Sequence, residues 1–304
     1  MRPTLMSAAA MRRINRTLVV AMVAAMVALG LAASAAAQDL QGTLKKVKDT
    51  GTLTLGYREN SPPFSFMSSL DRRFPVGDSV DLCQRVATAV QAKLGLANLQ
   101  VNWVPVTVAD RAAAVTSGRI DLECGSTSIT LGRQEQVDFS NMTWVDGAGL
   151  LVRSGQNLAS LSDMGGRRLA VIPGTTTEKA LTEALRKKTV SAQIVPVKDH
   201  DEGRDALLAG KVDGYVSDRV LLIGLLMTSK EPAKLVLADE QFSYEPYGLM
   251  LRRGDAPFRL LINRTLAALY RSDEIVRVYD TWFGAIGRPS SVLVLMYVLN
   301  ALPE

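Results

Sequence analysis

Charged side chains follow several of the strands that the sequence predicts. Arg58 closes a short alternating run that is typical of a strand, His200 follows another such run by three residues, and Asp218 comes directly after a third. In open α/β sheets, ligands bind at the carboxyl ends of strands, so these side chains are candidates for holding a charged small molecule. Asp218 also precedes a predicted helix, where an aspartate can serve simply as the N-cap.

Hydroxyl groups surround a second predicted helix start. Thr175 and Glu178 have the spacing of a capping box, and the free amides and dipole at that end favour an anion. The alternative is that Thr175 only caps the helix. Ser126 and Ser128 lie in a loop after another predicted strand.

No catalytic or metal-binding constellation stands out. The chain has one His and two Cys, and neither a Ser-His-Asp, a Cys-His nor a paired-carboxylate pattern is evident. We therefore expect no metal, no cofactor and no enzymatic activity. Cys83 and Cys124 could form a disulfide in an oxidising compartment, or they could be two buried free thiols.

The N-terminus has the pattern of a secretory signal peptide. Arginines 12, 13 and 16 precede an apolar run over residues 18–33, and Ala35–Ala37 offers a cleavage site. A membrane anchor is the alternative, although the run is short for a span. Cleavage after residue 37 removes four of the 35 basic side chains and none of the 30 acidic ones. A nearly neutral mature chain gives no argument for binding nucleic acid or membranes.

Strands and helices alternate in two series, which predicts two α/β lobes with parallel βαβ units. The expected strands are at 52–58, 99–104, 120–124, 168–172, 193–197, 212–217 and 247–251. The expected helices are near 44–48, 80–94, 109–116, 176–188, 201–209, 218–227, 257–270 and 273–283. We expect residues 38–147 in lobe 1, 148–245 in lobe 2 and 246–304 back in lobe 1. Two hinge strands would cross near 147–152 and 244–249.

Several segments resemble polar amino-acid-binding proteins of ABC transporters, across nearly the whole mature chain. They are Gly56-Tyr-Arg-Glu-Asn-Ser-Pro-Pro-Phe-Ser, Ser117-Gly-Arg-Ile-Asp, Glu123-Cys-Gly-Ser-Thr, Arg133-Gln-Glu-Gln-Val-Asp-Phe-Ser, Gly174-Thr-Thr, Lys198-Asp-His and Trp282-Phe. The first, third and sixth resemble the glutamate/aspartate-binding branch. The resemblance implies a type II periplasmic-binding-protein fold, two lobes joined by two hinge strands.

The resemblance also implies roles for particular residues. Arg133 would clamp the ligand α-carboxylate, since a guanidinium meets a carboxylate with two parallel donors. Ser126, Ser128, Thr175 and Thr176 would add donors to that carboxylate. By the same resemblance, Asp218 would bind the ligand ammonium. The side-chain carboxylate of the ligand would be bound by Arg58, Arg111 and His200.

Charge supports an acidic ligand. The expected pocket has a net charge of about +2, from Arg58, Arg111 and Arg133 against Asp218. A ligand without net charge would leave buried guanidinium groups unpaired, which costs several kcal/mol per ion. The branch has Ser at the position of Val108, so the exact dicarboxylate is open.

We therefore expect a monomeric periplasmic solute-binding protein that captures glutamate or aspartate and delivers it to ABC permease subunits by lobe closure. The alternative is a periplasmic enzyme on the same fold, similar to prephenate or arogenate dehydratases. In that case Glu59 or Glu178 would be the general acid. A sensor ectodomain is a weaker third reading, since no second membrane segment is evident.

Overall fold

The computed structural model describes residues 40–68, 71 and 73–304. The predicted signal peptide, residues 1–37, lies outside this part of the chain. By its contacts the chain divides into Met1–Gln41, of which only the last two residues are described, and a unit Gly42–Glu304. Everything below refers to the second unit. It contains two five-stranded sheets with helices around them, so the predicted two-lobed α/β class is confirmed.

The first sheet takes strands from both ends of the unit. Strands β1, β5 and β6 are parallel, and β13 runs antiparallel between β6 and β7. Its order is β5 (Gln100–Pro105), β1 (Thr52–Tyr57), β6 (Leu122–Cys124), β13 (Glu245–Arg252) and β7 (Val137–Asp146). The carboxyl ends of β1 and β6 lie together, because Tyr57 pairs with Cys124. The side chains that follow these two strands therefore start from one edge of the sheet.

The second sheet is formed by the middle of the chain. Strands β9, β10 and β11 are parallel, while β8 runs antiparallel to β11 and β12. Its order is β10 (Gln193–Pro196), β9 (Arg168–Val171), β11 (Gly214–Asp218), β8 (Ala148–Arg153) and β12 (Leu235–Leu237).

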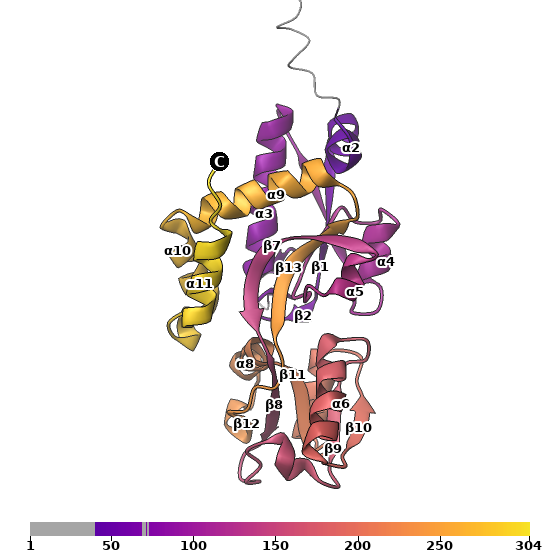
Figure 1. Ribbon diagram of the computed structural model, residues 1–304, viewed down its shortest axis with the longest axis vertical. Helices are drawn as coiled ribbons and strands as arrows, with labels where there is room; N and C mark the ends of the chain where they lie inside the picture. The colour runs from indigo at the N-terminus through magenta and orange to yellow at the C-terminus, as the bar shows by residue number, and fades with distance from the viewer. Residues whose placement is uncertain (1–39, 69–70, 72) are drawn as a thin grey trace, which may run out of the picture. The chain divides into compact units, whose positions relative to one another are not determined.

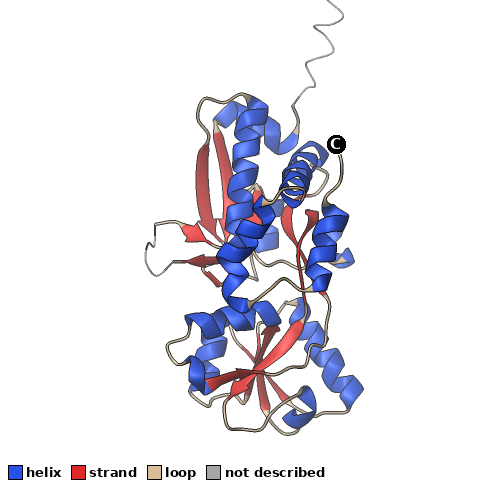
Figure 2. Cartoon of the chain, turned by 90° about the vertical axis from the view of Figure 1, so that its left-hand side faces the viewer, coloured by secondary structure: helices blue, strands red, loops and turns tan. Residues whose placement is uncertain are grey.

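Helices cover both sheets (Figure 2). With the first sheet are α2 (Gly42–Thr50), α3 (Asp78–Leu94), α4 (Arg111–Thr116), α5 (Leu131–Gln134), α9 (Ala256–Tyr270), α10 (Glu274–Phe283), the 3-10 turn η3 (Gly284–Ile286) and α11 (Ser291–Asn300). With the second are η1 (Leu161–Met164), α6 (Thr176–Lys188), α7 (His200–Leu208), α8 (Arg219–Thr228) and η2 (Pro232–Lys234). Helix α3 ends at Gly95 in the left-handed conformation, as its sequence predicts. Within the described residues, no helix has both the length and the apolar character needed to cross a bilayer.

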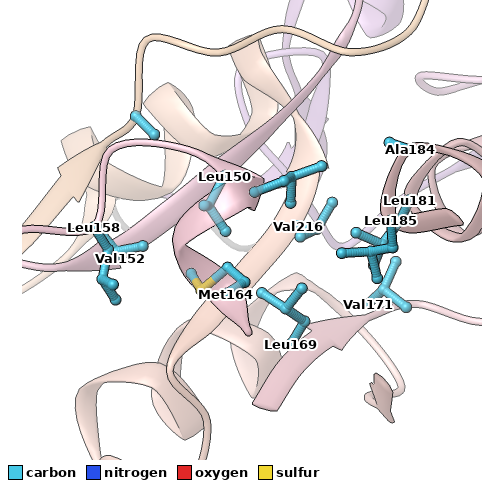
Figure 3. Packing of buried hydrophobic residues seen from close by; sticks show 12 residues of the cluster. Leu150, Val152, Leu158, Met164, Leu169, Val171, Leu181, Ala184, Leu185 and Val216 are labelled. Carbon is cyan, nitrogen blue, oxygen red and sulfur yellow. The ribbon is translucent and has the colours of Figure 1, made fainter. Parts of the chain in front are cut away.

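The second lobe has a hydrophobic core on each face of its sheet. Along β8, Leu150 and Val152 enter one cluster and Leu151 enters the other, as the two-residue repeat of a strand requires. Figure 3 shows the first cluster, where Leu150 and Val216 from two strands face Leu181 of α6. The sheet is thereby fixed between helices on both faces, which positions the residues at its edge.

The chain passes between the two sheets twice. Strand β7 ends at Asp146 and β8 begins at Ala148, so the first passage is made at Gly147. A Cβ at Gly147 would lie 2.3 Å from the Ser243 carbonyl oxygen of the returning segment. Only glycine therefore allows this close approach. The two passages also pair, because Glu245 of β13 lies opposite Asp146.

Residues 60–64 combine a short strand with a turn. Asn60–Ser61 forms a short strand, β2, in a three-stranded sheet with β3 (Ser65–Met67) and β4 (Pro75–Val76). The prolines make the turn between β2 and β3, and the Pro62–Pro63 bond is cis. The ladder of β2 stops just before the first proline, because proline has no N–H to donate to it.

Cys83 of α3 and Cys124 of β6 form a disulfide. It links a helix covering the first sheet to a central strand, directly before the loop that holds Ser126 and Ser128.

Candidate functional site

A cleft lies between the edges of the two sheets. Its lining includes every ligand-binding residue expected from the sequence except Arg133: Arg58, Arg111, Ser126, Ser128, Thr175, Thr176, His200 and Asp218. Arg133 lines an adjoining outer cavity, which shares Arg111, Thr175 and Thr176 with the cleft. The structure thus brings together residues from both lobes.

Two buried guanidinium groups face the cleft. Arg58 directly follows β1 and is 3 % exposed, and Arg111 is the first residue of α4 and is 6 % exposed. Among the described residues, neither guanidinium has a hydrogen-bond acceptor or an ion-pair partner. Burial, and next the positive charge of Arg111, lower the pKa of Arg58 to about 10. The cleft therefore holds positive charge that the protein does not neutralise directly.

His200 stands beside these arginines as a neutral imidazole. It is the first residue of α7, and its Nδ1 lies 2.7 Å from the hydroxyl of buried Tyr215. Burial, followed by the charges of Arg58 and Arg111, lowers the pKa of His200 to about 3. His200 therefore offers a hydrogen bond to a ligand and adds no charge to the cleft at neutral pH.

Asp218 occupies the N-cap position of α8 but does not cap the helix through its side chain. Its carboxylate accepts hydrogen bonds from the hydroxyls of Thr177, at 2.6 Å, and Tyr247. Burial, and then the charge of Glu245, raise the pKa of Asp218 to about 6. The reading of Asp218 as a simple N-cap is therefore wrong. It is a buried carboxylate that forms no ion pair among the described residues.

The hydroxyl of Thr175 is already occupied at the start of α6. It accepts from the Glu178 amide at 3.0 Å and donates to the Ile172 carbonyl at 2.8 Å. Glu178 accepts from the Gly174 amide instead of the Thr175 amide, so the predicted capping box is only half formed. Thr175 is a helix cap, and this end of α6 offers backbone amides to a ligand.

The two lobes touch at this helix start. The Thr176 hydroxyl lies 3.2 Å from the Ser128 hydroxyl of the first lobe. Arg133, from α5, donates to the Ser128 carbonyl at 2.6 Å, which directs its guanidinium toward the same loop. Burial, and next the charge of Arg111, lower the pKa of Arg133 to about 10.

Two buried carboxylates were missing from the charge count that the sequence suggested. Glu123 accepts from the Thr127 hydroxyl at 2.8 Å, and Glu245 accepts from the Ser243 hydroxyl at 3.0 Å. Both influence the pKa of Arg133. Neither lines the cleft, and within the described part of the chain neither forms an ion pair with an arginine. They therefore offset part of the positive charge without contacting the guanidinium groups.

Tyr215 and Tyr247 are the supporting residues that sequence reasoning missed. Tyr215 contacts His200 from within β11, and Tyr247 on β13 reaches across to Asp218. A tyrosine within an apolar strand is predicted to be a residue of the hydrophobic core. One feature of the sequence could have indicated their role. Each tyrosine lies near the end of a predicted strand, close to the sheet edge where the candidate binding residues are found.

The residues proposed for an enzymatic alternative do not enter the cleft. Glu59 is exposed, the Glu178 carboxylate is bound to the Gly174 amide, and neither lines the cleft. Within the described residues, no group of three or more His, Cys, Asp or Glu side chains could hold a metal ion. Val108 does line the cleft and contributes no hydrogen bond to it.

The chain is similar to known solute-binding proteins. Residues 53–285 match the profile of the bacterial extracellular solute-binding proteins, family 3. The chain is 38 % identical over 259 residues to an L-glutamate/L-aspartate-binding protein of Pseudomonas aeruginosa, covering 85 % of each chain. It is 32 % identical over 264 residues to a glutamate/aspartate import solute-binding protein of Escherichia coli, covering 85 % of this chain and 87 % of that one.

Solved structures show the same architecture. An ancestral arginine-binding protein bound to glutamine has a TM-score of 0.68 and 28 % identity, covering 77 % of this chain and 98 % of its own. An ancestral amino acid-binding protein, described as a precursor of cyclohexadienyl dehydratase, has a TM-score of 0.69 and 27 % identity, covering 80 % and 100 %.

Proposed function

The chain belongs to family 3 of the bacterial extracellular solute-binding proteins, which are transport proteins and not enzymes, and we propose that it captures glutamate or aspartate for import. One observation carries the choice of ligand. Arg58 and Arg111 are buried at the cleft, and neither guanidinium has a partner among the described residues. Burying an unpaired charge costs several kcal/mol, so a ligand carboxylate is the group that completes this site.

Each charged group of an acidic amino acid has a complementary group in the cleft. The side-chain carboxylate lies between Arg58 and Arg111 and receives a hydrogen bond from neutral His200. The ammonium pairs with Asp218, whose carboxylate forms no ion pair among the described residues.

The α-carboxylate lies at the start of α6, where the backbone amides of Thr176 and Thr177 have no intrahelical acceptor. The Ser128 loop and Arg133 approach the same place from the first lobe, and Ser126 lines the wall nearby. Since Val108 supplies no hydroxyl, the distal carboxylate depends more heavily on the two arginines.

Lobe closure follows from this division of groups. Arg58 and Arg111 belong to one lobe, while His200, Asp218 and the start of α6 belong to the other, so only a closed form satisfies the whole ligand. A ligand that binds the closed form more tightly shifts the population toward it. The contacts already present across the cleft, Ser128 with Thr176 and Tyr247 with Asp218, support this closed arrangement.

The wider setting is part of the same proposal. Residues 1–37 act as a signal peptide, and the mature chain works in the periplasm and delivers its ligand to the permease subunits of an ABC transporter. Residues 38–147 and 246–304 form lobe 1, and residues 148–245 form lobe 2. One chain supplies every group assigned to the ligand, so binding needs no second copy.

Isothermal titration calorimetry of the mature protein tests the ligand assignment. Glutamate, aspartate, glutamine, asparagine and prephenate should be titrated in turn. We expect micromolar or tighter binding of glutamate or aspartate and at least about a hundredfold weaker binding of the amides, because an amide leaves the guanidinium groups uncompensated. Equal affinity for glutamate and glutamine, or turnover of prephenate, would refute the proposal.

A further inference from the structure

The outer cavity beside the cleft is large enough to be a binding site of its own. Helices α4 and α5 line it from the first lobe, and the start of α6 lines it from the second. Its volume is about 580 Å³, within the range of about 300–1,000 Å³ that is typical of small-molecule sites. The outer cavity therefore has room for more than the end of one amino acid.

This cavity persists although the two lobes already touch. The hydroxyls of Ser128 and Thr176 lie 3.2 Å apart across the cleft, and Thr176 also lines the outer cavity. The approach of the lobes to this distance therefore does not remove the space. A free acidic amino acid would reach it only with its α-carboxylate, through Arg133, and would leave the rest of the cavity to solvent.

The charged side chains of the outer cavity are all cationic. Arg111, Arg133 and Lys179 line it, and no described Asp or Glu does. In the part of the chain that the structure describes, none of the three forms an ion pair. An exposed lysine such as Lys179 is ordinary by itself. Here, however, it shares a concave surface with the partly buried Arg133, so two cations face the space beyond the proposed position of the α-carboxylate.

The arrangement of the charges decides how a longer ligand would be joined. Thr175 and Thr176 border both the cleft and the outer cavity. A peptide bond at the ligand α-carboxyl group leaves a carbonyl oxygen, which the backbone amides at the start of α6 can still bind.

Extension through the side chain of the ligand is unfavourable. Arg111 also borders the outer cavity, so there is space in that direction. A γ-linked ligand would nevertheless place an amide beside buried Arg58 and Arg111 and leave both charges uncompensated, at a cost of several kcal/mol per ion. Linkage through the α-carboxyl group avoids this cost.

We propose that the outer cavity is a second anion subsite, and that the protein also captures short peptides whose first residue is an α-linked glutamate or aspartate. The first residue occupies the cleft as the free amino acid does, and the terminal carboxylate of the second residue pairs with Arg133 and Lys179. Ala112, Val137 and Met250 line the same cavity and favour a small apolar side chain on that second residue. This inference rests on the proposed function, because it uses the same sites for the ammonium and the side-chain carboxylate.

Isothermal titration calorimetry with glutamate and three peptides tests the inference. We expect glutamyl-alanine to bind within about tenfold of glutamate, because it keeps every charged pair. γ-Glutamyl-alanine should bind at least about a hundredfold more weakly than glutamyl-alanine, since it places no carboxylate at Arg58 and Arg111. Glutamyl-alaninamide lacks the terminal carboxylate and should bind at least about tenfold more weakly than glutamyl-alanine.

The substitution Lys179→Met separates the two subsites. It should weaken glutamyl-alanine about threefold to fivefold, as expected for the loss of one exposed ion pair, and change the affinity for glutamate by less than about 1.5-fold. Lys187→Met is the matched control and should change neither affinity. Lys187 is exposed on the same helix, pairs with Glu183 and does not line the outer cavity.

The outcomes separate this inference from the proposed function. Binding of glutamate without binding of glutamyl-alanine would overturn the inference and leave the proposed function intact. Equal affinities for glutamyl-alanine and its amide, or equal losses of glutamate and glutamyl-alanine in Lys179→Met, would also overturn it. If neither glutamate nor aspartate binds, the proposed function itself fails, and the peptide subsite fails with it.

Discussion

Replacing Arg58 by Met should weaken acidic ligands selectively and stabilise the ligand-free protein at the same time. Arg58 is buried at the cleft without a partner among the described residues, so its charge is unfavourable until a ligand carboxylate arrives. Methionine has a similar length but no charge. The substitution therefore removes both the unfavourable charge in the free state and its compensation in the bound state.

The magnitudes follow from the environment of the guanidinium. A hydrogen bond to a charged group contributes about 1.5–3 kcal/mol, and Arg111 with His200 would still hold the carboxylate, so we expect a loss near 3 kcal/mol. This corresponds to about 150-fold weaker glutamate binding. Glutamine should lose less than about fivefold, because its amide makes no charged pair.

The stability change has the opposite sign. The pKa of Arg58 is lowered from 12.5 to about 10, which corresponds to a cost of about 3 kcal/mol for holding it charged in the folded protein. Because the depressed pKa belongs to a base, this cost is fully present at every pH below about 10 and is relieved only above it. The free energy of unfolding of Arg58→Met should therefore rise, by up to about 3 kcal/mol.

Calorimetry with glutamate and glutamine, together with urea unfolding of the ligand-free protein, measures both effects. Arg186→Met is the control, since Arg186 is exposed on α6 and should change neither quantity appreciably. Equal losses for glutamate and glutamine would refute the assignment of Arg58 to the side-chain carboxylate. A lower free energy of unfolding in Arg58→Met would refute the argument that its charge is uncompensated.

Three other perturbations address the ammonium site, lobe closure and the disulfide. Asp218 has a pKa raised to about 6, and only its ionised form pairs with an ammonium, so affinity should fall about tenfold per pH unit below pH 6 and stay level above about pH 7. Asp218→Asn should bind weakly and remove this pH dependence, and an unchanged profile in calorimetry would contradict the assignment. Gly224→Ala places a Cβ 2.2 Å from the Pro62 carbonyl oxygen of the other lobe. It should weaken every amino acid ligand by at least about tenfold in calorimetry, because the lobes can no longer approach as closely at this point, and unchanged affinities would contradict the closure argument. Substituting both Cys83 and Cys124 by Ala opens a link across 41 residues and should cost about 4 kcal/mol of unfolding free energy in urea. A loss below about 1 kcal/mol would contradict the chain-entropy argument.

The sequence was sufficient for the parts of the molecule that depend on local pattern. The strand that ends at Tyr57, directly before Arg58, and the helix that is capped by Gly95 lie where periodicity and capping residues place them. The sequence did not reveal which hydrogen bonds the buried hydroxyl groups make. Thr175 and Asp218 look alike as residues before a helix, but one caps its helix and the other does not. That difference depends on Thr177 and Tyr247, which approach Asp218 from another helix and from the other lobe.

The net charge of the cleft was also only partly predictable from the sequence, and this charge affects how the ligand is bound. Counting arginines against Asp218 gave the cleft a large positive charge, but Glu123 and Glu245 are buried behind it and were not recognisable as neighbours. Because they do not pair with the arginines, they reduce the cost of burying positive charge without occupying the donors that a ligand needs. The arginines are therefore tolerated in the ligand-free protein and still lack their direct partners, and this combination makes the cleft selective for a ligand that carries a second carboxylate.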